Sequence, residues 1–495
     1  MTPHEERPPH DITAQPPAGG PPALPPGPPA PGVRRQLSPW VLGTLLVGLV
    51  LLFGFLTTLH LYSRTRFTPD ADLLAELQGA NFLEDTAPPA LPGPWPQWRG
   101  PRRDGVSPET VRATAWPEDG PPVLWEKTRQ KGEIGDGYSS LAVAGGRVCT
   151  LTQLDDEEAV VCWQADTGKE LWRRRYAANY RNDYGDGPRS TPAVDGDRVY
   201  TVGGTGMFHC LDAETGAVKW SHDLLTEFNA SNLRWGVSFS PLIEGDLVLT
   251  NPGGPNGKSV VAFDKHTGKV AWSALDDPAG YSSPVAIGEG DTRQVVFFTG
   301  KRLVGLSPRD GKLLWDFPWE TSHEVNAATP VAVRAKVGGQ EVHYLFISSG
   351  YGKGCALVKV WPAAKDSWQA RRVYEGNQML NHFSSCVRWK DQVYGFSDPG
   401  VLTCLDLRTG KVLWTEKGFK KGSLLAADGY LILLGENGKL ALAEATPEGY
   451  REKALCSPMG RKCWVMPVLA NGRLYLRDED KVVCLDLGGG PSGPR

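Results

Sequence analysis

Charged, aromatic and amide side chains recur in the segments that lead into a repeated Ser/Thr-x-Pro signal. If these segments meet in space, they form one polar and aromatic surface of mixed charge, which suits the binding of a small molecule or a peptide. Three cations, Arg189, Lys421 and Lys462, would anchor an anionic ligand or peptide. The alternative is that all of these are ordinary solvated loop residues. The candidate binding residues are Arg189, Trp235, Tyr281, Asn326, His382, Lys421, Lys462 and Trp464.

Recognised catalytic motifs are missing from the sequence. It contains no nucleophile elbow and no His-Glu-x-x-His metal motif, and its cysteines do not have zinc-ligand spacing. The glycine-rich stretches 203–206 and 251–257 are predicted to be hairpin turns, because no helix pattern follows either of them to complete a phosphate site. The sequence therefore predicts no catalytic residue and no metal ligand.

The nine cysteines all follow residue 140. Cys162, Cys210, Cys404 and Cys484 share one position of a repeat, where a small buried core residue is expected. Two pairs could form disulfides in an oxidising compartment. These pairs are Cys149 with Cys162, on facing strands of one predicted hairpin, and Cys456 with Cys463, on either side of a short loop.

The repeat that must position these residues is clearest at residues 404–414. Leu405 and Leu407 alternate with polar neighbours, as in a half-buried strand. Residues 406–410 then have turn chemistry, with an Asp acceptor followed by Thr-Gly, and the return strand carries a Trp at a fixed place. Each Trp is expected to fill the gap between splayed neighbouring sheets. The tryptophans at this position are Trp125, Trp172, Trp220, Trp272, Trp315 and Trp414.

A second repeat lies between the Trp motifs and predicts two further strands around a Gly-containing turn. The two repeats together give four strands in each unit, and clear copies recur about every 43 to 52 residues, which is the range of propeller blades. The segment Pro122–Lys127 has the strand and Trp that the last unit lacks, so it would close the ring. We therefore expect an all-β, eight-bladed β-propeller of four-stranded blades. The second repeat begins near Ser139, Ser190, Phe239, Ser282, Ala328, Ser384, Ser423 and Val465.

The pattern Asp-x-x-Thr-Gly-Lys-x-x-Trp resembles the tryptophan-docking repeat of quinoprotein-like (PQQ-like) β-propellers. That family includes PQQ-dependent dehydrogenases and the propeller subunit of the outer-membrane β-barrel assembly machinery. For an enzyme, the resemblance implies PQQ between a Trp floor and a vicinal Cys–Cys disulfide, with Glu and Asn on Ca²⁺ and an Asp base. The sequence has no adjacent cysteines; Glu324 and Asn326 could hold calcium, and Asp183 or Asp277 could act as base.

Four regions follow one another along the chain. Residues 1–36 are rich in Pro, Gly and Ala and are predicted to be a disordered tail. Residues 38–62 contain an uncharged apolar run between Trp40 and Tyr62, which predicts one uncleaved transmembrane helix. Residues 63–93 are expected to be a linker in which residues 70–83 form a short amphipathic helix. Residues 94–495 form the propeller, with the aromatics of residues 95–101 against its rim.

Composition and charge narrow the class of function. The net charge of −3 argues against a dedicated nucleic-acid binder. We expect a single-pass inner-membrane protein with a cytoplasmic N-terminus and a periplasmic propeller, which acts as a non-catalytic scaffold for a protein partner or peptide and binds no cofactor. The alternative is a PQQ-dependent oxidoreductase, an alcohol or sugar dehydrogenase that uses PQQ and Ca²⁺.

Overall fold

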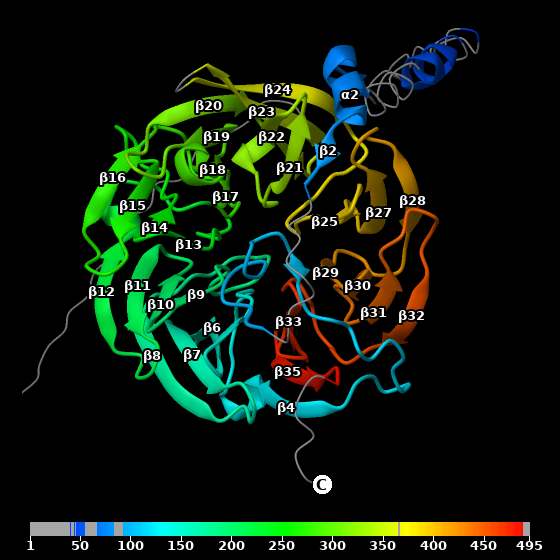
Figure 1. Cartoon of the computed structure of the whole chain (residues 1–495). Coiled ribbons are helices and arrows are strands. Elements are labelled where there is room, and N and C mark those ends of the chain that lie inside the picture. The colour runs from blue at the N-terminus through cyan, green and yellow to red at the C-terminus, as the bar shows by residue number, and fades with distance from the viewer. Residues whose placement is uncertain are drawn as a thin grey trace, which may run out of the picture. The chain divides into compact units, whose positions relative to one another are not determined.

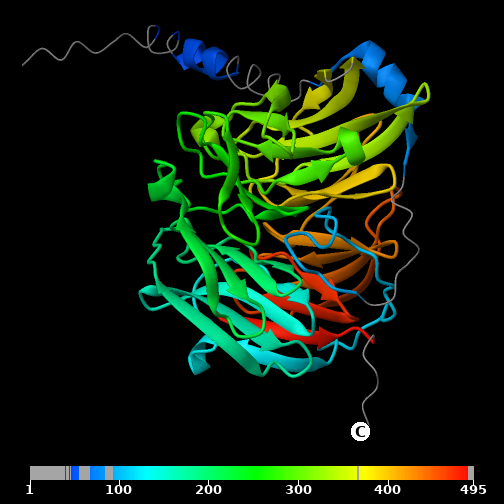
Figure 2. The same ribbon diagram turned by 60° about the vertical axis from the view of Figure 1, so that its left-hand side comes forward.

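The protein is described by a computed structural model that covers residues 40, 44, 46–54, 67–83, 93–364 and 367–488. Eight sheets in this part of the chain stand in a circle around a central channel (Figure 1). Figure 2 shows the same sheets after a turn of 60° about the vertical axis. Most of the predicted helix 38–62 lies outside the described residues. Those of its residues that are described, 40, 44 and 46–54, are helical. No helix within the described ranges is both long and apolar enough to cross a membrane.

We number the blades in chain order, each with its innermost strand first. Blade 1 contains β5 (Ala142–Ala144), β6 (Arg147–Leu154), β7 (Glu157–Gln164) and β8 (Glu170–Ala177), and blade 2 contains β9 (Ala193–Asp195), β10 (Arg198–Val202), β11 (Met207–Asp212) and β12 (Val218–Asp223). Blade 3 contains β13 (Leu242–Glu244), β14 (Leu247–Thr250), β15 (Val260–Asp264) and β16 (Val270–Ala274), and blade 4 contains β17 (Val285–Ile287), β18 (Gln294–Phe298), β19 (Arg302–Leu306) and β20 (Leu313–Pro318). Blade 5 contains β21 (Val331–Val337), β22 (Gln340–Ser349), β23 (Gly354–Ala364) and β24 (Ser367–Gly376), and blade 6 contains β25 (Val387–Trp389), β26 (Gln392–Ser397), β27 (Val401–Asp406) and β28 (Val412–Glu416). Blade 7 contains β29 (Ser423–Ala427), β30 (Tyr430–Leu434), β31 (Leu440–Glu444) and β32 (Glu452–Cys456), and blade 8 contains β33 (Val468–Ala470), β34 (Arg473–Arg477), β35 (Lys481–Asp486) and β4 (Val123–Thr128).

Blade 8 confirms the predicted closure of the ring. Its outermost strand, β4, comes from the start of the propeller and pairs antiparallel with β35, with Trp125 opposite Cys484. Joining the two ends of the chain in one sheet removes the open edges that a linear array would leave. Short helical elements lie in the loops between strands: η1 (Arg129–Lys131), α3 (Leu224–Glu227), η2 (Gly290–Thr292) and η3 (Ser322–Glu324).

The motif tryptophans lie between neighbouring blades. In five of the six, the indole N–H donates to a carbonyl of the next blade. In several cases the turn glycine of that blade lies against the indole ring. A side chain there would collide with the ring, since a Cβ at Gly268 would lie 2.8 Å from Trp220. Trp315 instead donates to the side chain of Gln294 in its own blade, at 2.5 Å, because blade 5 has no copy of the motif turn to receive it. The five carbonyl contacts are Trp125 to Ala165 (2.9 Å), Trp172 to Ala213 (3.0 Å), Trp220 to Lys265 (3.2 Å), Trp272 to Pro308 (2.9 Å) and Trp414 to Thr446 (2.8 Å).

Blade 5 uses different side chains for the same purpose. Tyr374 occupies the position of the tryptophan and donates its hydroxyl to the carbonyl of Leu407 in blade 6, at 3.0 Å. Phe67 packs beside Tyr374, with ring centroids 5.5 Å apart, and both rings lie against the turn glycine Gly410. Two smaller rings thus fill the space that one indole fills elsewhere.

Residues 67–83 belong to the edge of the propeller, whereas the sequence suggested a linker there. β1 (Thr68–Pro69) pairs with β24 and β2 (Asn81–Phe82) pairs with β21, so the segment adds a strand at each edge of blade 5. Between them α2 (Ala71–Gln78) buries Leu73 and Leu77, and the Asp70 side chain caps its first turn by accepting from the amide of Leu73. This segment therefore packs against both edges of blade 5, one of the two blades in which another residue stands at the Trp position.

Residues 93–107, which we call the strap, run through the channel instead of along the rim (Figure 1, light blue at the centre of the ring). Arg99 and Arg103 are fully buried in it. The strap makes hydrogen bonds to every blade, and β3 (Val106–Ser107) pairs in parallel with β29. In blade order these contacts are made to Val143, Val194, Pro241, Pro284, Thr329, Cys386, Ala426 and Asn471.

Candidate functional site

One end of the channel opens into a cavity of about 390 Å³, which we call the funnel. Most of its wall comes from the segments that lead into the innermost strands, and all eight blades contribute. A cavity of this size is at the lower end of the range for small-molecule sites. The lining residues are Trp98, Tyr138, Tyr184, Arg189, Trp235, Ser238, Ser240, Tyr281, Ser283, Val325, Ala327, Tyr351, His382, Phe383, Lys421 and Trp464.

Six of the eight candidate residues line the funnel: Arg189, Trp235, Tyr281, His382, Lys421 and Trp464. Lys462 lies beside it, with its ammonium 3.2 Å from the Tyr138 hydroxyl and 4.5 Å from the centre of the Trp464 ring. The geometry thus brings these residues together. Whether they bind a ligand stays a prediction.

Asn326 does not face the funnel. Its side chain is fully buried, where the amide donates to the carbonyls of Thr299 and Trp319 and the oxygen accepts from Ser349. Residues 323 and 324 just before it have positive φ, which turns the loop so that the Asn326 side chain points into the blades. Asn326 therefore fixes the loop, and its hydrogen-bonding groups are occupied.

Sequence reasoning missed several of the aromatic residues of the funnel. Tyr138 and Phe383 stand directly beside the Ser-x-Pro signals and could have been found from them. Tyr351 comes from the loop between β22 and β23, and Trp98 comes from the strap, so no repeat pointed to either. Trp98 is held by a 2.9 Å hydrogen bond from its indole N–H to the hydroxyl of Thr329.

The strap forms the floor of the funnel. Arg103 donates to the carbonyls of Ser240, Pro241 and Pro284 at 2.8 to 3.0 Å, and Arg99 donates to that of Cys386 at 2.5 Å. Burial, with the nearby charge of Arg99, lowers the pKa of Arg103 to about 9, so it stays protonated at neutral pH. Because these guanidiniums fill the channel below Trp98, the funnel is closed at this end.

The aromatic side chains of the wall are in mutual contact. Trp235 and Tyr351 are nearly parallel, at 19°, with ring centroids 6.3 Å apart, and Trp235 also contacts Tyr281 at 5.6 Å. On another part of the wall Trp464 contacts Tyr138 at 5.3 Å and Phe383 at 5.0 Å. Flat rings with polar edges give a large contact area at low conformational cost, which favours binding of apolar or aromatic groups.

Arg189 is a half-buried cation of the wall. Its guanidinium donates to the carbonyls of Gly185 and Gly187, both at 2.6 Å, and lies over the rings of Tyr138 and Tyr180. It pairs with no carboxylate among the residues that the structure describes. Burial lowers the pKa of Arg189, which nonetheless remains charged.

The other two cations are already neutralised. Lys421 lies 3.2 Å from Asp398 and 3.2 Å from Nδ1 of His382, whose Nε2 is 2.9 Å from the Tyr351 hydroxyl. Burial and the charge of Lys421 lower the pKa of His382, which favours the neutral ring.

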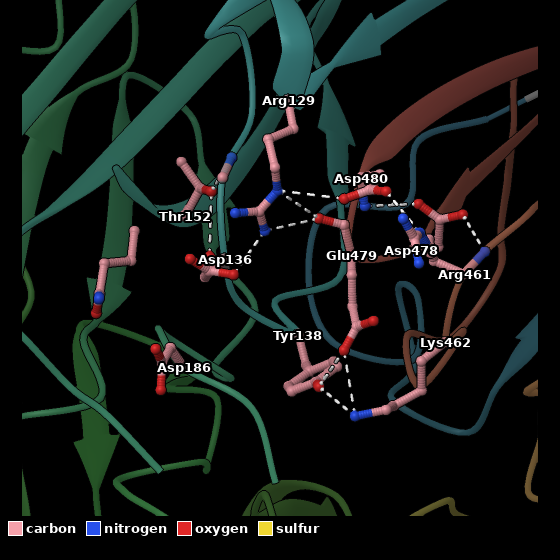
Figure 3. A network of polar contacts seen from close by, with 12 residues as sticks. Arg129, Asp136, Tyr138, Thr152, Asp186, Arg461, Lys462, Asp478, Glu479 and Asp480 are labelled. Carbon is pink, nitrogen blue, oxygen red and sulfur yellow. Dashed lines mark hydrogen bonds and ion pairs between the residues drawn. The ribbon is translucent and has the colours of Figure 1, made fainter. Parts of the chain in front are cut away.

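Lys462 pairs with Glu479 at 3.2 Å, and the same Glu479 oxygen accepts from the Tyr138 hydroxyl at 2.9 Å (Figure 3). Burial and Glu479 raise the pKa of Tyr138, so its hydroxyl stays protonated. Behind this pair, Arg129 joins Asp136 and Asp480 in the same network. These contacts hold the Tyr138 and Lys462 side of the wall in place.

Several features of the quinone cofactor site that the family resemblance implied are absent from the described part of the funnel. All nine cysteines are buried, none lines the funnel, and none is adjacent in sequence to another. Of the suggested polar residues, Asn326 uses its side-chain amide in hydrogen bonds within the blades, and Asp277 forms an ion pair with Arg302 at 2.8 Å. No group of three or more acidic, His or Cys side chains within the described ranges is placed to hold a metal ion.

Three comparisons with known proteins agree with this architecture. The outer membrane protein assembly factor BamB of Yersinia pestis is 24% identical over 299 residues, which cover 58% of this chain and 71% of the relative. The quinohemoprotein alcohol dehydrogenase from Comamonas testosteroni shares the fold with a TM-score of 0.60, at 13% identity, over 86% of this chain and 85% of the other. BamB from Moraxella catarrhalis also shares the fold, with a TM-score of 0.50 at 16% identity, over 74% of this chain and 99% of the other.

A family model described as outer membrane protein assembly factor BamB matches residues 110–189 and 180–416, more than half of the sequence. This match agrees with the eight blades and with the Trp motif seen in the structure. The chain therefore belongs to this family of PQQ-like β-propellers.

Proposed function

We propose that the protein is a non-catalytic scaffold whose funnel mouth binds a segment of a protein partner. The observation that carries this proposal is the set of exposed aromatic side chains at the mouth, where Tyr184 is 53% and Tyr351 42% exposed. Exposed aromatic residues around a concave site are typical of the anchoring points of protein interfaces. The relatives named as assembly factors support a role in protein interaction.

The same proposal includes a location. Residues 38–62 would anchor the chain in the inner membrane with the N-terminus in the cytoplasm, and the propeller would lie in the periplasm. The relatives are named as outer membrane protein assembly factors, which supports an extracytoplasmic site for the propeller. A protease added to spheroplasts should digest the propeller and leave the tail 1–36 protected. Protection of the propeller would contradict this orientation.

Site-specific photo-cross-linking tests the scaffold role. A photoreactive amino acid replaces Tyr184 or Tyr351 at the mouth, or Val270 on the outer strand β16, which is 48% exposed and serves as the matched control. We expect discrete cross-linked products from the two mouth positions and none from position 270. Equal products from all three positions, or none from the mouth, would contradict a partner at the funnel.

The alternative is a PQQ-dependent oxidoreductase, which the fold shared with quinohemoprotein dehydrogenases favours. Titration of the full chain with PQQ and Ca²⁺, followed by tryptophan fluorescence and dye reduction, separates the two. The scaffold proposal expects no alcohol- or sugar-dependent dye reduction. Tight binding together with substrate-dependent reduction would establish the enzyme instead.

A further inference from the structure

The funnel can accept the end of a chain but not a chain that passes through. The strap fills the channel with two buried guanidiniums, and Trp98 closes the floor. A segment of a partner must therefore enter and leave by the same mouth, or it must end inside. In a cavity of about 390 Å³ there is little room for a chain to reverse direction, so a chain end is the simpler occupant.

The charge of the wall selects which end. The lining contains Arg189 and Lys421 but no Asp or Glu side chain. The carboxylate partner of Lys421, Asp398, is not part of the lining, and Arg189 has no such partner among the described residues. A terminal ammonium would find no acidic side chain in the lining, whereas a terminal carboxylate would supply the ion-pair partner that Arg189 lacks there.

The aromatic part of the wall selects the last side chain. The ring centroids of Trp235 and Tyr281 are 5.6 Å apart, and Trp98 lines the same cavity. Aromatic rings prefer offset or edge contacts with other rings, and such pairs add to the burial of apolar area. The floor also offers the small polar side chains Ser238, Ser240 and Ser283, which leave space for a bulky ring.

We propose that the funnel binds the C-terminal end of a polypeptide whose last residue is aromatic, with the terminal carboxylate at Arg189 and the ring among Trp235, Tyr281 and Trp98. This inference rests on the proposed function, because it names the part of the partner that enters the site. A free aryl carboxylate has the same chemistry at its binding end, so the experiment must separate the two sources.

The test measures fluorescence anisotropy with the purified full chain and short Gly/Ser peptides labelled at the N-terminus. The peptides end in Phe with a free carboxylate, in Phe amide, or in Ala with a free carboxylate. We expect the Phe acid to bind roughly tenfold to a hundredfold more tightly than the Phe amide, because this factor corresponds to the free energy of a hydrogen bond to a charged group. The Ala acid should also bind more weakly than the Phe acid.

Two substitutions separate the two contacts. Arg189→Gln should abolish the preference for acid over amide, and Trp235→Leu should abolish the preference for Phe over Ala while keeping that for the acid. Arg181→Gln is the matched control, since Arg181 lies in the same loop, is exposed and pairs with Asp156 and Asp186 outside the funnel. Arg189→Lys, which keeps the charge, should retain part of the acid preference, and near-UV circular dichroism checks that each variant is folded.

Three results would overturn the inference. These are equal affinity for acid and amide, an unchanged acid preference in Arg189→Gln, or no binding of any peptide. If N-acetylphenylalanine competes as strongly as the peptide binds, the ligand is a small aryl carboxylate and the peptide assignment is wrong. If the peptides fail while cross-links from Tyr184 persist, the inference falls and the proposed scaffold role stands; if both fail, both fall.

Discussion

Arg103, in the strap, donates a hydrogen bond of 2.8 Å to the carbonyl of Pro284, the proline of the Ser-x-Pro signal in blade 4. The same guanidinium reaches Pro241, the corresponding proline in blade 3, at 2.9 Å. One side chain from outside the repeats therefore satisfies carbonyls that two repeats leave pointing into the channel. The strap thus acts as an internal tie between blades as well as the floor of the funnel.

Arg103→Met should be strongly destabilising, because it leaves these buried carbonyls without a donor. We expect the free energy of unfolding to fall by at least about 3 kcal/mol, since each unsatisfied buried group costs roughly 1–3 kcal/mol. Urea unfolding followed by tryptophan fluorescence measures the change. Arg102→Met is the control, because Arg102 is partly exposed in a surface pair with Asp104, and such pairs contribute about 0–1 kcal/mol. Equal effects of the two substitutions would contradict the tie.

Trp272→Ala tests the contact between blades 3 and 4. The indole is 8% exposed, donates to Pro308 at 2.9 Å and lies against Gly311 of the next blade. Removing a buried large aromatic should lower the free energy of unfolding by roughly 3–5 kcal/mol. Val270→Ala, on the same strand but 48% exposed, should change it by less than about 0.5 kcal/mol. A melting curve unchanged by Trp272→Ala would refute the docking role of the indole.

The thiols should be unreactive in the native protein. All nine cysteines are buried, and burial raises the pKa of Cys355 and of Cys386 to about 12, so the reactive thiolate is scarce at neutral pH. After reduction, native protein should react with a thiol reagent far more slowly than protein in urea, which should titrate nine thiols. Rapid reaction of any thiol in the native state would contradict this burial. Without reduction, a count below nine would indicate that Cys149 and Cys162, whose sulfurs are 3.0 Å apart, pair during folding.

The repeats explain how much of the fold could be predicted. A strand, a tight turn and a Trp recur at nearly constant spacing, because every blade solves the same packing problem, so the number of blades and the closing strand follow from counting. Blades 5 and 7 depart from the pattern. In blade 7 Ala454 stands at the Trp position. In blade 5 Tyr374 and Phe67 replace the Trp, and neither residue has a repeated counterpart that would have identified it.

The funnel was predicted only as far as the repeats reach. Loop residues such as Arg189 and Trp464 were found because they precede a repeated signal. Trp98 was not, because the strap occurs once and its place in the channel depends on contacts with every blade. Asn326 was misplaced for a local reason: its position in the loop is right, but two positive φ values turn its side chain inward.

Two buried histidines should make stability depend on pH. Burial, together with the charge of Arg174, lowers the pKa of His209 to about 4, and burial with Arg334 and Arg293 lowers that of His343 to about 4. The unfolded chain binds a proton at each histidine near pH 6.5, whereas the folded protein does so only near pH 4. Between these values the unfolded state holds more protons, so stability falls as the pH is lowered.

The double variant His209→Gln, His343→Gln isolates this contribution from that of the carboxylates. Each histidine can contribute a slope of up to about 1.4 kcal/mol per pH unit between pH 6.5 and pH 4. Urea unfolding of the wild type at a series of pH values should therefore show a steeper loss of stability on acidification than unfolding of the double variant. His266→Gln is the control, since the His266 side chain is 52% exposed. Parallel curves for wild type and double variant would show that these rings are protonated as readily in the folded protein as in the unfolded chain.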